Sequence, residues 1–388
     1  MGLDTGIHSR GPAPAGFAFP PRKYRQLRLR HSNFHTSWKS ESALVNSSAK
    51  KLWWTGFAVL AVLVPFNVSP EITRTLVLAL IASIGAIGLN IVGGVAGQLS
   101  LGHAGFLGVG AFSAAWVTSN QGWSFWWSLP LGGVVAGLFG LLMAPIALRL
   151  RGLYLSVVTL GFVFVMQHVF RTAESITGGV SGNRVVTPVV GGVDLIRGGE
   201  VAGLTVGQNV PYYFLALFVT GVTVIATKNL LRSRTGRNFA AIRDHDIAAG
   251  VVGVNVFTTK MQAFVISSFI AGVAGALLGG FLRFVTFEQW DLLMSVQYLA
   301  MIVLGGLGSV SGAVLGAFFV ITLPEIVDSF GGSLPFVSKD PGYGLTSERL
   351  STIIYGVLIA AVMVIEPLGL FGLWNRIRNY FSFWPFRN

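Results

Sequence analysis

The chain has 388 residues, of which 53% are hydrophobic and 11% charged, and its formal net charge is +12. Soluble domains are about 25% charged, and no Asp, Glu, Lys or Arg occurs between Thr75 and Leu148. The composition therefore excludes an ordinary soluble domain and predicts a polytopic membrane protein. Cysteine is absent, which excludes disulfides, thiolate metal sites and cysteine nucleophiles.

The first 51 residues form a basic segment with nine Lys or Arg and two acidic residues. Its prolines, serines and basic cluster Arg22–Arg30 predict a disordered cytoplasmic tail without the apolar core of a signal peptide. This tail is suited to lie on anionic membrane lipid, and a transit peptide or an over-extended start site is the alternative. Because most of the net charge lies here and no basic, aromatic-interleaved face follows, we expect no nucleic-acid partner.

Apolar runs predict an all-α bundle of about ten transmembrane helices in a permease domain over 52–373. Several runs are shorter than the roughly 20 residues that a crossing needs, so we expect some broken or partial crossings. The runs are 53–68, 74–92, 104–119, 127–148, 152–170, 211–228, 261–282, 290–306, 309–326 and 350–366.

Basic residues predict the orientation, because cytoplasmic loops carry an excess of Lys and Arg. With a cytoplasmic N terminus and ten crossings, the inner segments hold 20 basic residues and the outer ones seven. The C-terminal tail 374–388 is then also cytoplasmic. Loop 171–210, rich in Gly, Thr and Val, is then external and forms either a small lid or hairpin or a solvated connector.

Two Gly-rich segments, Ala96–Phe112 and Gly305–Phe319, occur in the two halves of the chain. Shifted by 206 residues, they share five identities in thirteen positions, a weak internal repeat. Matching glycine interruptions in two halves are typical of a transport pathway. The candidate pathway residues are Gln98, Ser100, Gly102 and His103. They either line that pathway or satisfy carbonyls exposed where a helix is broken.

A charged stretch, Arg232–Lys260, separates two apolar runs and, with Lys228, carries six basic groups. Its middle, Asn238–Gly250, is expected to form about three helical turns with one apolar side, and glycines end it. That apolar side comprises Phe239, Ile242 and Ile247. The stretch looks too ordered for a linker and too short for an enzyme domain. We interpret it as a docking surface for another protein, with an interfacial helix that has no partner as the alternative.

Several motifs of energy-using or catalytic proteins are missing. No Lys follows a Gly, so the phosphate loop is absent, as are HExxH and GxSxG. Secondary transporters usually need intramembrane ionisable groups, and none lies securely within a span. The sequence thus predicts a transport subunit that is not an enzyme and that draws energy from a partner. An ion-coupled carrier and an intramembrane enzyme are the alternatives.

Six segments together resemble the branched-chain amino acid ABC importer permeases, specifically the longer of the two paired permease types. The likeness covers roughly Arg74–Leu373. The segments are AGQLSLGHAGFLGVGAF (96–112), RGLYLSVVTL (151–160), TGG-x-SG (177–182), SRTGRNFAAIRDHDIAAGVVGVN (233–255), GGLGSVSGAVLGAFF (305–319) and PLGLFGL (367–373).

The resemblance implies a multi-pass subunit of the bacterial inner membrane that carries branched-chain or other hydrophobic amino acids. Its implied partners are a second permease, two ATP-binding subunits and a periplasmic or lipid-anchored substrate-binding protein. ATP would be used by those partners, and this chain would hold no cofactor or metal. Relatives of the family carry urea or short amides, which are the alternative substrates.

The resemblance also implies a cytoplasmic loop, 229–260, that couples the permease to the ATPase. Similarity to the family pattern assigns this role to Arg243, Asp244, Asp246, Ala248, Ala249 and Gly253. ABC importers at large carry a Glu-Ala-Ala…Gly pattern in this loop, whereas this chain has Asp246 in place of Glu and an inserted Ile.

Overall fold

The computed structural model describes residues 48–150, 152–190, 193–201, 204–331 and, near the C terminus, 350, 353–354, 356–357, 360–361 and 369–372. The predicted tails 1–51 and 374–388 and the span 350–366 lie wholly or mostly outside the described residues. The chain divides into units 1–59 and 60–388. Of the first unit the structure describes only the beginning of helix α2 (Ser48–Asn67), and the second is described below.

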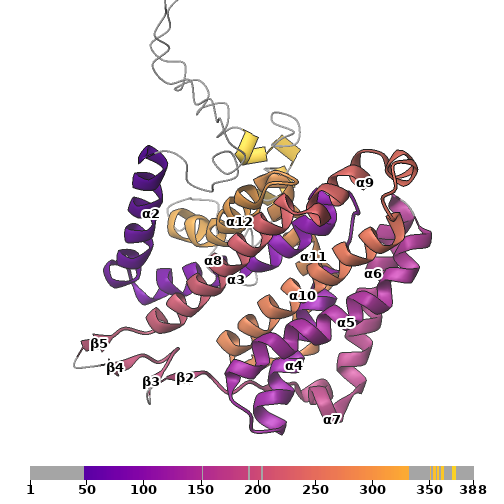
Figure 1. Ribbon diagram of the computed structural model, residues 1–388. Helices are drawn as coiled ribbons and strands as arrows, with labels where there is room; N and C mark the ends of the chain where they lie inside the picture. The colour runs from indigo at the N-terminus through magenta and orange to yellow at the C-terminus, as the bar shows by residue number, and fades with distance from the viewer. Residues whose placement is uncertain are drawn as a thin grey trace, which may run out of the picture. The chain divides into compact units, whose positions relative to one another are not determined.

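The second unit is a helical bundle with short strands in its loops (Figure 1). Its long helices are α3 (Pro70–Asn90), α4 (His103–Ala115), α5 (Ser128–Arg149), α6 (Leu153–Thr172), α8 (Val210–Arg232), α9 (Arg234–Val251), α10 (Val256–Leu282), α11 (Leu292–Gly305) and α12 (Val310–Gly331). The short helix α7 is Glu174–Thr177, and π-helical turns η1 (Ile91–Val95) and η2 (Trp116–Asn120) extend α3 and α4.

Short polar side chains mark where these apolar helices begin. The Ser69 hydroxyl accepts a hydrogen bond from the Ile72 N–H before Pro70 opens α3. Asn255 accepts from the Thr258 N–H at α10, and Asp291 accepts from the Met294 N–H at α11. Each satisfies a backbone donor that the first helical turn leaves free, which fixes the start of the helix.

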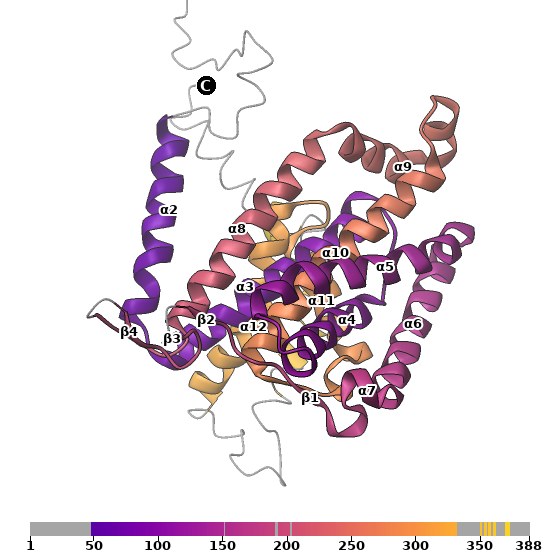
Figure 2. The same cartoon turned by 60° about the horizontal axis from the view of Figure 1, so that its bottom comes forward.

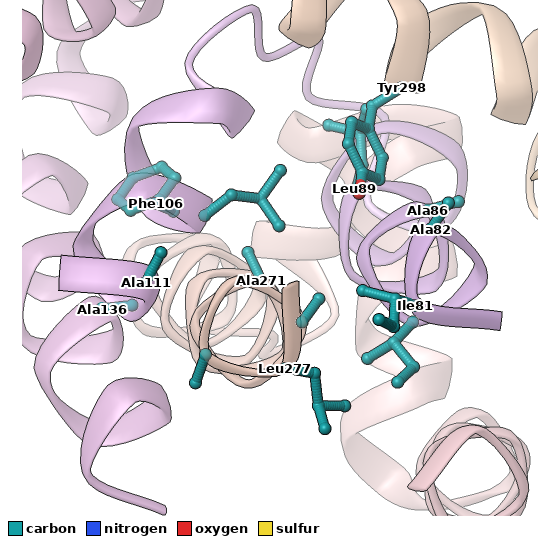
Figure 3. Packing of buried hydrophobic residues seen from close by; sticks show 14 of the residues in the cluster. Ile81, Ala82, Ala86, Leu89, Phe106, Ala111, Ala136, Ala271, Leu277 and Tyr298 are labelled. Carbon is teal, nitrogen blue, oxygen red and sulfur yellow. The ribbon is translucent and has the colours of Figure 1, made fainter. Parts of the chain in front are cut away.

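Helix α10 lies in the core of the bundle. Figure 3 shows its Ala271 and Leu277 between Ala111 and Ala136 on one side and Ile81 of α3 on the other. Of the α3 span 83% is buried, against 22% of the α8 span, so α3 is internal and α8 peripheral. The small side chains of Ala271, Ala111 and Ala136 let helix backbones approach closely, which is how helices pack in lipid.

Among the described residues, five helices are long and apolar enough to cross a bilayer, and Val310–Ile326 is a shorter apolar helix. The five are Pro70–Val95, Phe125–Ile146, Tyr154–Thr172, Val210–Arg232 and Val256–Leu282. Helix α11 has 14 residues. At about 1.5 Å per residue it reaches only about 20 Å, short of a hydrocarbon core of about 30 Å. The multi-pass helical prediction is confirmed, while about ten full crossings stays a prediction.

Segments expected on the same side of the membrane lie at the same end of the bundle. At one end, β1 (Asn183–Arg184) pairs with β6 (Phe284–Val285), and Asn209 donates to the Pro70 carbonyl. Helix α9 lies at the opposite end in both views (Figures 1 and 2). We call these the hairpin end and the α9 end.

The loop 171–210 contains two small antiparallel hairpins rather than a plain connector. Strand β2 (Val189–Val190) pairs with β3 (Val193–Asp194), and β4 (Gly199–Val201) pairs with β5 (Leu204–Val206). Burial raises the pKa of the Asp194 carboxyl. Hydrogen bonds from the Ile196 and Arg197 N–H groups and the Thr187 hydroxyl, together with the Arg283 charge, outweigh burial and leave the pKa below its ordinary value.

Candidate functional site

Helix α9 consists of two helical segments joined at a kink. His245 has the non-helical angles φ −156° and ψ 101°, which divide α9 into a first segment, 234–244, and a second segment, 246–251. The Ser233 hydroxyl caps the first segment by accepting from the Gly236 N–H. The sequence predicted one uninterrupted helix over Asn238–Gly250. The helix is longer than that, and its interruption changes which side chains share a face.

The first segment is seated in a small hydrophobic cluster separate from the main core. Phe239 is completely buried there, and Ile242 is nearly so. They pack with Ile91 and Val95 of the π-helical turn and with Ala263 of α10. This seat joins α9 directly to the end of α3, one of the most buried helices of the bundle.

The second segment presents apolar side chains to solvent. Ile247 is 72% exposed, Val251 84% and Val252 79%. Placing Ile247 on the same apolar side as Phe239 and Ile242 was wrong, because the kink at His245 turns the second segment relative to the first. Asp246 and Lys260 form an ion pair of 3.3 Å that ties this segment to α10.

The remaining predicted coupling residues of α9 differ in exposure. Ala249 is buried in the hydrophobic cluster, whereas Ala248 is exposed. Gly253 has φ +93° in the turn that follows the helix, a conformation that favours glycine. Asp244 lies 3.5 Å from the Arg243 guanidinium in an exposed pair, a kind of contact that contributes little to stability.

Arg243 points from the first segment toward the glycine-rich backbone of the bundle. Its Nη1 donates a hydrogen bond of 3.0 Å to the Gly94 carbonyl. Gly97, at φ +70°, faces the same side chain, and a Cβ there would lie 2.7 Å from Arg243 Cγ. Gly308, at φ +81°, faces it as well, since a Cβ there would lie 3.2 Å from Nη1. One side chain therefore meets both Gly-rich segments.

The first Gly-rich segment leaves helical geometry between η1 and α4, and neighbouring hydroxyls satisfy its backbone. Ser156 donates to the Leu99 carbonyl at 3.3 Å, and Thr159 accepts from the Leu101 N–H at 2.9 Å. The Ser100 hydroxyl accepts from the Gly102 N–H. Irregular backbone at membrane depth persists only with such partners.

His103 is held within the bundle. Its Nε2 is 2.9 Å from the Gly85 carbonyl of α3, and its ring packs 5.1 Å from that of Tyr298. Gly102 is packed equally tightly, since a Cβ there would lie 2.8 Å from the Thr159 carbonyl oxygen. The contacts of Ser100, Gly102 and His103 are thus those of residues that close a broken helix.

Gln98 differs from these three residues. Its side chain is buried, yet neither its amide nitrogen nor its amide oxygen has a hydrogen-bond partner among the described residues. Gln98 also lines a cavity of about 260 Å³ between the first Gly-rich segment and α9, together with Arg243, Asp246 and Lys260. A buried amide without hydrogen-bond partners is energetically costly.

Sequence reasoning missed Asn90, which ties the end of α3 to the second Gly-rich segment. Its Oδ1 accepts from the Gly308 N–H at 2.8 Å, and the side chain is buried. A lone amide at the end of an otherwise apolar run is the signal that was available. A second cavity, of about 300 Å³, lies beside this contact and is lined by Arg243, Gly306, Leu307, Gly308, Ser309, Phe371 and Gly372.

The apolar helices, their close small-residue packing and the irregular glycine backbone define a multi-pass membrane permease. The family model for the permease component of branched-chain amino acid transport systems matches residues 71–365, and the chain belongs to this family. The resemblance seen in the sequence is thereby confirmed. The family is one of permease components, not of catalytic subunits, and has no cofactor.

Named relatives agree with this family. The chain is 31% identical over 342 residues to LivM of Escherichia coli (strain K12), a high-affinity branched-chain amino acid transport system permease protein, covering 84% of this chain and 76% of LivM. LivM of Salmonella typhimurium is 32% identical over the same shares. The autoinducer 2 import system permease protein LsrC of Enterobacter sp. is 33% identical over 122 residues, which is 30% of this chain and 35% of LsrC. No solved structure matches the chain.

Proposed function

We propose that this chain is a permease subunit of an ATP-driven importer and moves branched-chain or other hydrophobic amino acids across the bacterial inner membrane. Support for the cargo comes from the LivM proteins, whose similarity extends over 84% of the chain. Similarity to LsrC, named for autoinducer 2, covers only 30%. Energy comes from separate ATP-binding subunits, since the chain has no phosphate loop of its own.

The exposed second segment of α9 is the observation that carries this proposal. Ile247 and Val251 are four residues apart on a helix, so they share one face, and Val252 follows directly. Exposed apolar patches outside the spans mark contact sites. The occupant we assign to this patch is an ATP-binding subunit, because the transport reaction needs one and α9 is the most charged inter-span stretch.

The assignment of an ATP-binding subunit to α9 also gives the proposed orientation of the chain in the membrane. The remaining partners are then placed at the two ends of the bundle. The α9 end is cytoplasmic, as are both termini, and the coupling loop is 229–260 within a permease domain of 52–373. The hairpin end is external and receives a periplasmic or lipid-anchored binding protein. A second permease subunit and two ATP-binding subunits complete the importer.

We assign the cargo pathway to the first Gly-rich segment, which contains Gln98. An amino acid zwitterion needs dipoles rather than full counter-charges in a low-dielectric path, and irregular backbone supplies them. The unpartnered Gln98 amide adds both a donor and an acceptor at this point. Ser100, Gly102 and His103 contribute by holding the irregular backbone in place.

Co-purification and uptake test the proposal. In the assembled importer, Val251→Asp puts a charge into the apolar contact. We expect the variant to lose the ATP-binding subunits and leucine uptake together. Val190→Asp is the matched control, because Val190 is the same residue type and is also exposed, but lies at the hairpin end. Its complex should retain the ATP-binding subunits.

Two results would contradict the proposal. One is accumulation of solute against its gradient by vesicles that contain this chain alone, which is the behaviour of an ion-coupled carrier. The other is full retention of the ATP-binding subunits by the Val251→Asp complex. Competition of leucine uptake by urea or acetamide, with none by isoleucine or valine, would replace the proposed cargo by short amides.

A further inference from the structure

We infer that Arg243 is a positioning residue that links α9 to two glycine-rich breaks. The first break is the irregular backbone between η1 and α4, and the second is that between α11 and α12. A displacement of α9 then alters the two breaks together. The inference rests on the proposed function, in which α9 receives movement from an ATP-binding subunit. It assigns Arg243 a role through the guanidinium nitrogen that contacts the bundle, while the rest of this half-exposed side chain faces outward. This separates Arg243 from the docking surface, with which its place in the coupling loop had grouped it.

The first link runs from α9 to the end of α3. Arg243 Nη1 donates to the Gly94 carbonyl in the π-helical turn. A π-helical turn is a local weakness in a helix and is frequent at functional sites. Phe239 and Ile242 pack on Ile91 and Val95 of the same turn, so α9 holds it by an apolar contact and by a charged donor at once.

The second link runs from α9 to the break between α11 and α12. Gly308 lies beside the same guanidinium, and its N–H donates to Asn90 of α3. The guanidinium thus lies beside both breaks, while Asn90 ties the end of α3 to the second break without involving α9. Gly97 and Gly308 both have a positive φ, which favours glycine. Because glycine has no Cβ, neither backbone pushes Arg243 away.

The kink at His245 separates this linkage from the docking surface. Arg243 belongs to the first segment of α9, and the exposed apolar side chains Ile247 and Val251 belong to the second. The second segment has its own contacts with the bundle, through the Asp246–Lys260 ion pair and the buried Ala249, whereas the contacts with Gly94, Gly97 and Gly308 belong to Arg243 of the first. The planar guanidinium has several fixed donors, whereas a lysine ammonium is a single point charge on a flexible stem.

Arg243→Lys in the complete reconstituted importer tests the inference, since it keeps the charge and removes the fork. We expect the ATP-binding subunits to remain bound and ATP hydrolysis to continue. Solute transported per ATP should fall roughly fivefold, the effect of losing one partly exposed charged hydrogen bond. Arg237→Lys is the matched control on the same segment, where Arg237 donates to the Arg232 carbonyl, and it should leave this ratio unchanged.

A second variant approaches the same contact from the other side. Gly97→Ala places a Cβ against Arg243 Cγ and should lower the transport-to-ATP ratio as Arg243→Lys does. Gly152→Ala controls for backbone strain, because Gly152 also has a positive φ, of 58°, but open space around its Cβ position. Only the Gly97 variant should change the ratio.

Distance measurements supply a readout that simple destabilisation does not produce. The chain has no native cysteine, so spin labels at Leu99→Cys and Leu307→Cys, both exposed, report the separation of the two breaks. We expect a change in this separation on ATP binding, and its loss in the Arg243→Lys complex.

Three outcomes would overturn the inference. They are normal coupling in Arg243→Lys, an ATP-dependent distance change that persists in that variant, and loss of the ATP-binding subunits from it. The last would make Arg243 a docking residue and leave the proposed function intact. Failure of the unmodified chain to bind ATP-binding subunits would instead remove the proposed function itself.

Discussion

Truncation of Phe239 should detach α9 from the bundle without unfolding the rest. Phe239 is completely buried, and its cluster has six other buried members, of which three are alanines. Phe→Ala in a core costs about 3–5 kcal/mol, and a loss of about 3 kcal/mol raises the detached fraction of α9 roughly 150-fold.

Hydrogen exchange of backbone amides measures this detachment. In Phe239→Ala we expect exchange to accelerate across 234–244 by about two orders of magnitude, while α10 keeps its protection. Phe257→Ala is the matched control: it removes the same side chain at the same end of the bundle, where Phe257 is exposed. Equal exchange rates in the two variants, or unchanged protection of 234–244, would refute the claim that this cluster seats α9.

Two further predictions concern backbone contacts. Thr159→Val leaves the Leu101 N–H without its acceptor and should destabilise the protein by about 1–3 kcal/mol. Thr159→Ser keeps the hydroxyl and should preserve the thermal unfolding midpoint in detergent. Equal midpoints for the two variants would contradict this prediction. The pKa of Asp194 is lower in the folded loop than in an unfolded one, so its stabilising effect is complete above the ordinary carboxyl range and is lost as pH falls through the lowered value. Exchange of the Ile196 and Arg197 amides should therefore show an acid-dependent loss of protection in the parent protein that Asp194→Asn lacks.

The limits of many spans could be read from the sequence within a few residues. The run expected at 127–148 is α5, Ser128–Arg149, and that at 211–228 is α8, Val210–Arg232. Such agreement follows because membrane insertion depends on the apolar content of a window of about 20 residues, which is a property of composition. The charged stretch between α8 and α10 was located for the same reason.

Local geometry within these elements was not predictable in the same way. The π-helical turns and the kink at His245 depend on how neighbouring segments press on the backbone, not on residue propensity. An uninterrupted helix was therefore expected where α9 bends, and Ile247 was assigned to the wrong side. Glycine at 97 and 308 signalled irregular backbone but not what would lie against it.

The sequence by itself determined the class of protein, its apolar helices and the family, because these depend on composition and on motifs within short windows. Only the tertiary structure brought Gly94 and Gly308, from opposite halves of the chain, to one guanidinium on α9. That convergence arises from the packing of α3, α9 and the α11–α12 break. Contacts between segments so distant along the chain leave no periodic pattern in it.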